Sequence, residues 1–174
     1  MAKSISSPII KEGIRLRLLE AFDLPMTLKW RNQDHIRKWF IHSEVISPEK
    51  HREWFETYLQ RDNDYLFIIE ETLRLNKPVG QISLYNIDRD RKCAEYGRLM
   101  IGEADARGRG LAKKASRLLL QYAFKVLGME RVELEVFRDN GPAIAIYRDL
   151  GFLEISDLEG LKKFIVDEKD VRLN

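Results

Sequence analysis

The apolar spacing of this chain changes at Gly108, and that change limits most strongly what the chain can fold into. Before Gly108, several short runs alternate apolar and polar residues, which is typical of half-buried strands. After it, apolar residues from Leu111 to Tyr122 recur at steps of three and four, and the pattern continues to Val126. This spacing predicts one helix of about 17 residues, roughly 25 Å long, which Gly128 ends. The chain therefore combines strands with a long helix.

Two further helices are predicted in the first third of the chain. Residues 14–18 alternate apolar and basic side chains as a strand does, and Asp23 and Pro25 then begin a helix that runs to about Arg31. Ser47 and Pro48 begin the second helix. Its apolar face has helical spacing and consists of Trp54, Phe55, Tyr58 and Leu59.

The middle of the chain predicts three strands joined by short polar turns, at residues 65–69, 79–85 and 94–101. Consecutive strands with such connections form an antiparallel meander. After the long helix follow a strand at 132–136, a helix from Asn140 to Leu150, and two strands at 152–155 and 164–166. The expected fold class is mixed α/β (α+β), with about seven strands in a central, mostly antiparallel twisted sheet and about four flanking helices.

Length and composition favour one compact domain. The chain has 174 residues, 44% hydrophobic and 33% charged, so we expect a single domain over residues 13–174. Residues 1–12 lack sustained periodicity and are expected to form a flexible tail. A net charge of +2 is too small for binding driven by bulk attraction to nucleic acid or an anionic membrane. Since neither a membrane-spanning apolar run nor a signal-peptide pattern is found, a cytoplasmic location is expected.

Neither a disulfide nor a metal site is predicted. Cys93 is the sole cysteine, and His35, His42 and His51 are not spaced with carboxylates as metal ligands are. Cys93 follows a charged turn without a neighbouring histidine. We therefore expect an idle thiol rather than an acyl-accepting nucleophile.

The segment with the most specific chemistry is residues 107–113, between a strand and the long helix. Gly108 and Gly110 let the backbone turn so that its N–H groups point into one concavity, and the helix N-terminus adds partial positive charge. Arg107, Arg109 and Lys113 add cations. Such a loop suits a pyrophosphate. It lacks the third small residue of a dinucleotide fingerprint and the Gly-Lys-Ser/Thr of a P-loop.

Two blocks of sequence resemble the GCN5-related N-acetyltransferase (GNAT) superfamily, whose members bind acetyl-CoA. Arg107, Gly110 and Ala112 match the family's Arg/Gln-x-x-Gly-x-Gly/Ala signature. The second block is residues 140–152, which resemble the family's Asn-x-x-Ala-x-x-x-Tyr-x-x-x-Gly-Phe stretch. All five marker positions match, at Asn140, Ala143, Tyr147, Gly151 and Phe152. The order of strands and helices also resembles the GNAT fold.

The resemblance implies acetyl-CoA as cofactor, CoA as product, and direct transfer of the acetyl group to a primary amine of a small molecule. It implies that the strand ending at residues 100–102 splays from its neighbour, leaving N–H groups for the acetyl carbonyl and the pantetheine arm. Residues 107–113 would bind the pyrophosphate. The implied cofactor-binding residues are Met100, Ile101, Gly102, Arg107, Gly108, Arg109, Gly110, Leu111, Ala112, Lys113, Asn140, Ala143 and Tyr147.

Two residues are candidates for catalytic proton transfer. Tyr147 matches the family's tyrosine position, and a phenol with a reference pKa of about 10 can protonate a departing thiolate with a reference pKa of about 8.5. Simple packing on its helix is the alternative. Glu95 is the candidate base, directly or through water, although a surface glutamate in a strand is the ordinary explanation. Asn140 can contact the cofactor arm and also cap its helix.

The acceptor pocket is expected from residues 24–61 and 156–163. Trp-Arg-Asn at residues 30–32 and His-x-x-Trp-Phe at residues 51–55 resemble ribosomal-protein N-terminal acetyltransferases and, more closely, the amino-sugar-nucleotide N-acetyltransferases of pseudaminic-acid synthesis. A slight basic excess over residues 24–61 favours an anionic amino-sugar nucleotide or related small amine over a polyamine. The ordinary expectation for Trp30, Trp39 and Trp54 is the core.

Other functions stay open at this point. The acceptor could be a protein N-terminal α-amine, or the chain could be a non-catalytic acyl-CoA-binding module. The balanced charge disfavours a nucleic-acid-binding protein. The resemblance also allows a homodimer, although no segment identifies an interface.

Overall fold

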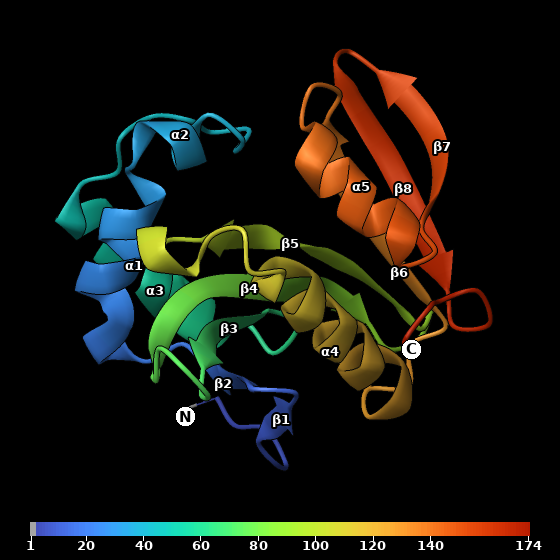
Figure 1. Ribbon diagram of the computed structural model, residues 1–174, viewed down its shortest axis with the longest axis horizontal. Coiled ribbons are helices and arrows are strands. Elements are labelled where there is room, and N and C mark those ends of the chain that lie inside the picture. Colours follow the sequence, from blue (N-terminus) through green and yellow to red (C-terminus); the bar gives the residue numbers. More distant parts are fainter. Residues whose placement is uncertain (1–2) are drawn as a thin grey trace.

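The computed structural model describes residues 3–174 and contains an eight-stranded mixed sheet, in the order β1-β2-β3-β4-β5-β6-β8-β7 (Figure 1). Neighbouring strands are antiparallel except for β5 and β6, which are parallel. The strands are β1 (Ile9–Lys11), β2 (Ile14–Leu18), β3 (Tyr65–Glu71), β4 (Lys77–Asp88), β5 (Cys93–Ile101), β6 (Arg131–Phe137), β7 (Leu153–Leu158) and β8 (Leu161–Asp167). The antiparallel meander predicted from residues 65–101 is confirmed as β3, β4 and β5.

The four predicted helices are confirmed as α1 (Leu24–Arg31), α3 (Pro48–Gln60), α4 (Leu111–Lys125) and α5 (Gly141–Asp149). Helix α4 has 15 residues, two fewer than its apolar spacing predicts. Three short helical segments were not predicted: α2 (Asp34–Arg37) and the 3₁₀ turns η1 (Ala21–Asp23) and η2 (Ala104–Ala106). Each has only three or four residues, too few for a periodic pattern.

The helices cover both faces of the sheet. Strand β3 shows the division, because Phe67 and Ile69 enter the main core that includes α4, whereas Leu66 and Ile68 pack with Phe55 of α3 on the other face. Helices α1 and α3 lie beside one end of the sheet, and α5 packs near β6 and β8 at the other end (Figure 1). The parallel β5–β6 junction therefore lies between two groups of helices.

The predicted tail over residues 1–12 differs from the structure at residues 9–11. These residues form β1, and Ile9 pairs with Leu16 of β2. The turn between the strands is Glu12-Gly13, and both residues have positive φ, at 51° and 79°. Two such residues match the twist of a tight hairpin, a local signal that the absence of longer periodicity hid. Residues 1 and 2 lie outside the described part of the chain.

Candidate active site

A cleft opens where β5 and β6 part. The two strands pair only from Cys93 to Glu95 on β5, although β5 continues to Ile101 and β6 to Phe137. This is the divergence that the sequence resemblance implied. A cavity of about 450 Å³ fills the gap, here named the cleft cavity. Its walls include Tyr96, Gly97, Leu99, Met100 and Ile101 of β5, Glu135 and Val136 of β6, Asn140, Ala143 and Tyr147 near α5, and Trp39, Phe40, Ile41 and His42.

A β-bulge in β5 accompanies this divergence. Met100 lies opposite Gln81 and Gly97 lies opposite Ser83, so β5 uses one residue more than β4 between the two pairs. Arg98 lies within the bulge with a positive φ of 52°. A bulge bends its strand and increases its twist. The backbone of β5 is thereby able to leave β6 while it stays paired with β4.

Gly102 follows β5 and supports this arrangement by packing. A Cβ atom at Gly102 would lie 2.0 Å from Cγ of Trp30, so the buried indole of α1 occupies the space of a side chain. The Gly102 N–H donates to the carbonyl of Val79 at 2.8 Å. This N–H group is therefore already used within the fold, unlike the free N–H groups predicted for residues 100–102. Met100 lines the cleft cavity, and its buried side chain packs with Trp30.

Tyr147 lies on α5, with its side chain facing the cleft cavity and 6% of its surface exposed. Its helix begins as the sequence predicts, because the Asn140 side chain accepts from the Ala143 N–H at 3.4 Å. The Tyr147 ring meets Tyr96 and Phe152 edge-on, at centroid distances of 5.5 and 5.8 Å. Burial is the main reason that the pKa of Tyr147 is raised above 10, so the phenol keeps its proton at neutral pH.

Tyr96, which lies in the strand predicted at residues 94–101, joins Tyr147 at the cleft cavity. Its hydroxyl lies 2.5 Å from Ser116 Oγ, which in turn donates to the carbonyl of Ala112 at 2.7 Å. A serine hydroxyl has one proton, so Tyr96 is the donor to Ser116. Burial raises the pKa of Tyr96 well above its usual value. Tyr96 and Tyr147 are therefore both neutral at physiological pH.

Glu95 lies at the last paired position of β5, opposite Glu133 of β6. It is half-buried and accepts from Asn86 Nδ2 at 3.0 Å, but it is not among the residues that line the cleft cavity. Burial, with Glu95 nearby, raises the pKa of Tyr85 to about 12, so Glu95 and the cleft-lining Tyr85 are neighbours. Glu135, an exposed carboxylate two positions beyond Glu133, does line the cavity. Glu135 could not be predicted from the sequence, because it alternates with buried residues as any solvent-facing strand residue does.

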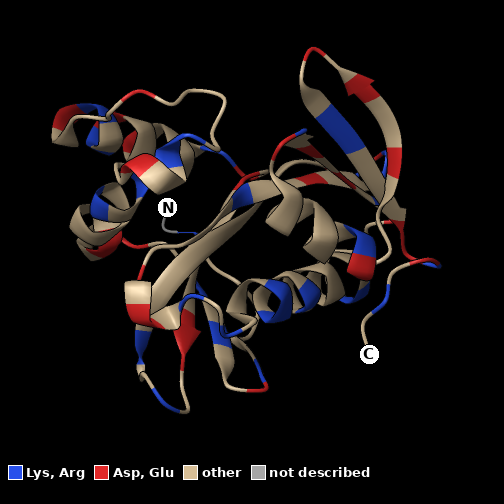
Figure 2. Cartoon of the chain, turned by 45° about the horizontal axis from the view of Figure 1, so that its top comes forward, with Lys and Arg blue, Asp and Glu red and all other residues tan. Residues whose placement is uncertain are grey.

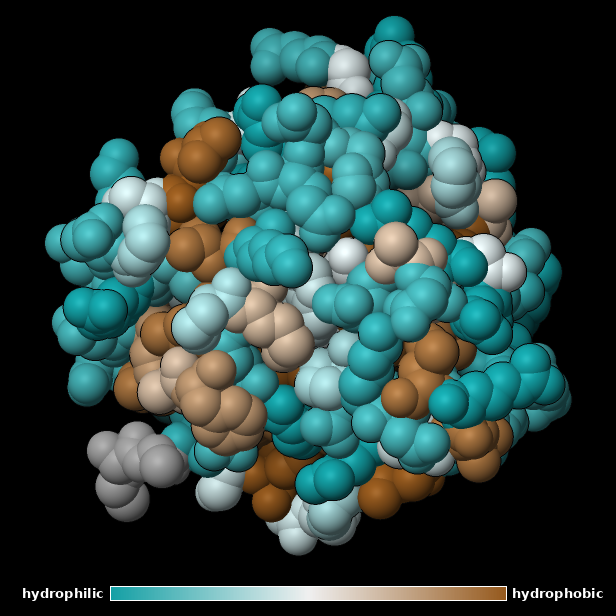
Figure 3. Space-filling model, turned by 60° about the vertical axis from the view of Figure 1, so that its left-hand side comes forward, coloured by the Kyte–Doolittle hydropathy of each residue, from teal (hydrophilic) through white to brown (hydrophobic). Residues whose placement is uncertain are grey.

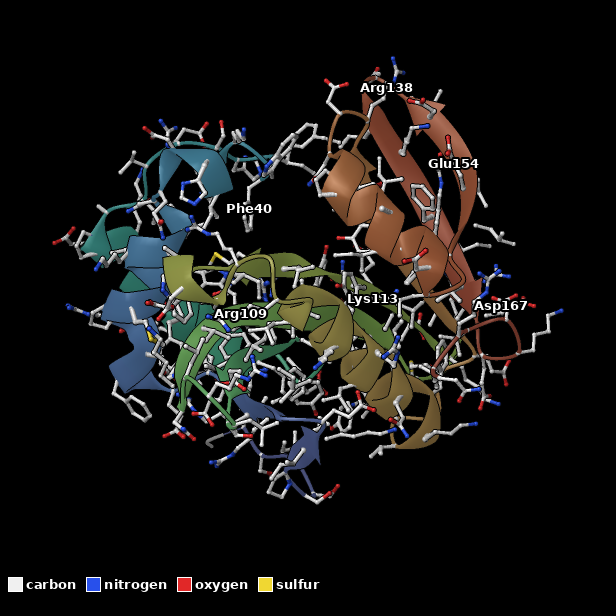
Figure 4. The ribbon with its side chains drawn as sticks, viewed as in Figure 1. Phe40, Arg109, Lys113, Arg138, Glu154 and Asp167 are labelled. Atoms are coloured by element: carbon white, nitrogen blue, oxygen red, sulfur yellow. The ribbon has the colours of Figure 1, made fainter. Side chains whose placement is uncertain are left out.

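The loop at residues 107–110 is exposed and lies before the N-terminus of α4. Gly108 and Gly110 have φ of 71° and 72°, and nothing lies within 4 Å of a Cβ built at either position. Arg109 Nε donates to the carbonyl of Asp105 at 2.6 Å, and Lys113 pairs with Asp149 at 2.9 Å. Figure 4 places Arg109 and Lys113 at this end of α4, and Figure 2 shows the helix's basic residues. The first N–H groups of α4 have no partner within the helix, so loop and helix together fit a pyrophosphate.

Three further residues that were predicted to bind the cofactor, Arg107, Leu111 and Ala112, make contacts within the protein. Arg107 Nη2 donates to Gln33 Oε1 at 3.2 Å and to the carbonyl of Gly102 at 3.3 Å, so Arg107 connects the loop to the α1–α2 region. The side chain of Leu111 is buried in the main core, and Ala112 supplies the carbonyl that Ser116 uses. These residues shape the loop through packing and internal hydrogen bonds.

A second cavity, of about 340 Å³ and here named the α1–α3 cavity, adjoins the first. Arg31, Phe40 and Arg98 line both cavities. The other residues of the second cavity are Leu19, Thr27, Ile46, Lys50, His51, Trp54, Leu66 and Gln81. Its lining therefore contains basic, apolar and neutral polar side chains and no Asp or Glu. The acceptor pocket was predicted from residues 24–61 and 156–163. Most residues of the cavity belong to the first range, whereas the second range lines neither cavity.

The three tryptophans divide between core and cavities. Trp30 is buried at 1% exposure, whereas Trp39 is exposed and lines the cleft cavity. Trp54 lines the α1–α3 cavity and stacks on His51, with planes 8° apart. His51 Nε2 lies 3.0 Å from Thr27 Oγ1, and burial, with Arg31 nearby, lowers the pKa of His51. A neutral imidazole at this cavity was not predicted, because a single histidine carries no spacing signal.

Residues 38–47 form a loop that carries Phe40 and one wall of both cavities. Asn32 braces the loop with two hydrogen bonds of 2.9 Å, to the carbonyl and from the N–H of Ile46. Ile41 and Val45 are strongly exposed. Figure 3 shows the side of the molecule formed by α1 to α3, where apolar patches alternate with hydrophilic surface. Figure 4 shows Phe40 across from α5.

Cys93 lies outside both cavities. It is half-buried, and burial is the main reason that its thiol pKa is raised, which disfavours the nucleophilic thiolate. Within residues 3–174, no group of three or more His, Cys, Asp or Glu side chains is arranged to hold a metal ion. In the same part of the chain, no helix is long and apolar enough to cross a bilayer.

The buried phenol, the parted pair of parallel strands and the exposed loop before α4 match the features expected of a CoA-dependent acyltransferase. Comparison with known proteins supports the same class. Residues 14–153 match the family model described as "Acetyltransferase (GNAT) domain". The putative ribosomal N-acetyltransferase YdaF of Bacillus subtilis is 32% identical over 149 residues, which cover 83% of this chain and 80% of YdaF.

Two solved structures share the fold at lower identity. The spermidine N-acetyltransferase of Vibrio cholerae, in complex with CoA and spermine, has a TM-score of 0.81 and 21% identity, covering 91% of this chain and 97% of that chain. Apo FdhC, described as a nucleotide-linked sugar GNAT, has a TM-score of 0.82 and 22% identity, covering 95% of this chain and 93% of that chain.

This chain belongs to the GNAT acetyltransferase family. It is an N-acetyltransferase, and acetyl-CoA is its acetyl donor.

Proposed function

We propose that this enzyme acetylates the primary amine of a small acceptor that carries an anionic group, with an amino-sugar nucleotide as the leading candidate. The observation that carries the proposal is the lining of the α1–α3 cavity. Its unpaired positive charge comes from Arg31 and Lys50, since His51 is neutral and Arg98 pairs with Asp64, and no carboxylate lines it. Such a lining attracts a phosphate or carboxylate and repels a second ammonium group.

In this proposal, Tyr147 acts as general acid. Acetyl-CoA supplies an activated thioester carbonyl, so no covalent enzyme intermediate is required. Because burial raises the pKa of Tyr147, its phenol stays protonated and can donate this proton to the departing thiolate of CoA. Glu95 removes the proton of the incoming ammonium directly or through water, and its neighbour Tyr85 lines the cleft. The loop at residues 107–113, with Asn140 and Ala143, binds the donor.

The charge of the cavity argues against a polyamine acceptor. A polyamine carries several positive charges and is best bound by carboxylates. Glu135 is the one acidic residue lining either cavity, and it lies on the cleft side. It can attract a single ammonium group toward the cleft. One cation site beside a basic cavity fits an acceptor with one amine and one anion.

A protein N-terminal α-amine is the second candidate. It is supported by the identity with YdaF, which is named as a putative ribosomal N-acetyltransferase. A peptide also presents a single ammonium group. A homodimer and a cytoplasmic location stay predictions.

The test is thiol release from acetyl-CoA with uridine-diphosphate-linked 4-amino-4,6-dideoxy sugars, the same sugars without nucleotide, spermidine, and short peptides. Native protein and Tyr147→Phe are compared. The proposal expects strong turnover with the nucleotide-linked sugar, reduced in the variant. Preferred turnover of peptides would favour the second candidate. Equal turnover by native protein and Tyr147→Phe would contradict the proposed acid.

A further inference from the structure

Arg31 is a buried cation without a counter-ion. It is the last residue of α1, and 8% of its surface is exposed. Its Nη2 donates to the carbonyl of His42, and the Phe40 ring stacks on the guanidinium at 4.2 Å. Its Nη1 is buried and has no hydrogen-bond partner among residues 3–174. Nη2 is therefore bound to the loop, whereas the N–H groups of Nη1 can still donate to another partner.

The other well-buried arginines at this side of the sheet have carboxylate partners. Arg17 pairs with Asp23 at 2.7 Å, and Arg98 pairs with Asp64 at 2.7 Å. Arg31 has no carboxylate within 4.0 Å in the described chain. Burial is the main reason that the pKa of Arg31 is lowered, while the exposed Glu44 acts to raise it and the like-charged Arg37 to lower it. A buried charge that lacks a partner is costly, so an anion from outside the chain would stabilise it.

Arg31 also lies at the junction of the two cavities, because it lines both. The cleft cavity is lined by Tyr147, and the α1–α3 cavity is lined by Lys50 and His51. An acceptor with its amine in the first cavity can therefore reach the guanidinium with a group in the second. The Phe40 ring lines both cavities and stacks on the guanidinium of Arg31. An anion can therefore reach Nη1 only if this ring moves.

We infer that Arg31 is the specificity-determining residue for the acceptor and binds its phosphate or carboxylate oxygens through Nη1. This inference rests on the proposed function, since it assigns the anionic group to the acceptor. A guanidinium presents planar, parallel donors that match such oxyanions, and it stacks on an aromatic ring more readily than an ammonium does. Arg31 thus selects acceptors by their anionic group, away from the amine that is acetylated.

The first experiment measures binding without turnover. The protein is saturated with CoA, which occupies the pyrophosphate loop, and uridine diphosphate is then titrated by calorimetry. Arg31→Met keeps an unbranched side chain and removes the guanidinium, and it should weaken uridine diphosphate binding by about 10- to 100-fold. Arg37→Met is the matched control. Arg37 also braces the same loop, through Ser43 O at 2.8 Å, but it lines neither cavity.

The second experiment measures selectivity with two amines that differ by one phosphate, ethanolamine phosphate and ethanolamine. The ratio of their kcat/KM values should fall by about tenfold or more in Arg31→Met, whereas Arg37→Met should keep the native ratio. Arg31→Lys should recover part of this ratio, since it restores charge without the planar fork. Circular dichroism and acetyl-CoA affinity verify that each variant is folded.

The outcomes separate the two claims. Equal uridine diphosphate binding by native protein and Arg31→Met, or none by either, would overturn the role of Arg31. An unchanged kcat/KM ratio in Arg31→Met would do the same. The proposed function fails in a different way, if no small amine on the acceptor panel releases thiol from acetyl-CoA. Binding of uridine diphosphate that depends on Arg31 would still support the inferred anion site in that case.

Discussion

The ring of Tyr147 meets the ring of Tyr96 edge-on, with 5.5 Å between centroids and 80° between planes. Tyr147 comes from α5 and Tyr96 from β5, so this contact joins the two sides of the parted sheet. Phe152 packs against both rings. The phenol proposed as general acid is therefore positioned by an aromatic cluster and not by an ionic partner.

Removing the Tyr147 hydroxyl should affect chemistry far more than folding. Tyr147→Phe keeps the ring and its edge-on contacts, so the unfolding free energy should change by less than about 1.5 kcal/mol. The value of kcat should fall by about 10²- to 10⁴-fold. Steady-state kinetics and chemical denaturation measure the two effects.

Tyr122→Phe is the matched control for this change. Tyr122 is also buried and meets Phe67 edge-on at 5.8 Å, but it does not line the cleft. Its loss of hydroxyl should leave kcat unchanged. A similar fall of kcat in both variants would assign the effect to packing and would remove Tyr147 from the chemistry.

A side chain at Gly102 should destabilise the protein, because it would disrupt the packing of Gly102 against Trp30. Gly102→Ala would place a Cβ 2.0 Å from the Trp30 ring, so one of the two buried groups must move. We expect a loss of about 1 to 3 kcal/mol or more in unfolding free energy. Gly141→Ala is the control, because nothing lies within 4 Å of its built Cβ. Thermal unfolding distinguishes them, and equal melting temperatures would contradict the packing described here.

A side chain at Gly110 should weaken binding of the donor through its pyrophosphate. Gly110→Ala forces alanine into positive φ, where it costs about 1 to 2 kcal/mol, and it changes the path of the loop. The Kd of acetyl-CoA should rise about tenfold, whereas turnover of acetyl-pantetheine, which has no pyrophosphate, should be unaffected.

Gly160→Ala provides the control for backbone strain. Gly160 also has a positive φ, 82°, with nothing near a built Cβ, but it lies in the turn between β7 and β8. This variant should lose similar stability and keep the native Kd for acetyl-CoA. Equal losses of acetyl-CoA affinity in both variants would refute the loop as the pyrophosphate site.

A base at Glu95 should be needed most where the acceptor amine is protonated. Glu95→Gln should lower kcat/KM at neutral pH by about 10²-fold, and the defect should shrink as pH rises toward the pKa of the amine. The native pH profile, however, should show no loss from Tyr147 ionisation below about pH 10, because burial raises the pKa of that phenol.

Glu135→Gln tests the other carboxylate near the reacting groups. Glu135 lines the cleft cavity, and Glu95 does not. If Glu95 is the base, Glu135→Gln should mainly raise KM by weakening attraction of the ammonium. A pH-dependent loss of kcat in Glu135→Gln, with a native profile in Glu95→Gln, would transfer the base role to Glu135.

The sequence predicted those features that depend on local pattern. Periodicity located α4 and the meander, and the capping pattern around Asn140 located α5. Short elements such as α2 and β1 were missed, because three or four residues carry no period.

Features that depend on long-range contacts could not be predicted in the same way. The site phenol Tyr147 was found by its place in a motif, whereas Tyr96 and Glu135 reach the cleft only through the divergence of β5 and β6. Arg31 is one of several basic residues in its segment. Arg31 differs from the others because it is buried without a counter-ion. This burial depends on the contacts of Phe40 and His42 with its guanidinium. No pattern in the sequence encodes those contacts.

The proposed reaction transfers an acetyl group to a small amine that carries an anionic group. The most direct measurement is kcat/KM for a uridine-diphosphate-linked 4-amino sugar and for spermidine, followed as thiol release from acetyl-CoA. We expect a value at least about tenfold higher for the nucleotide-linked sugar, because the α1–α3 cavity is basic. A higher value for spermidine would contradict it.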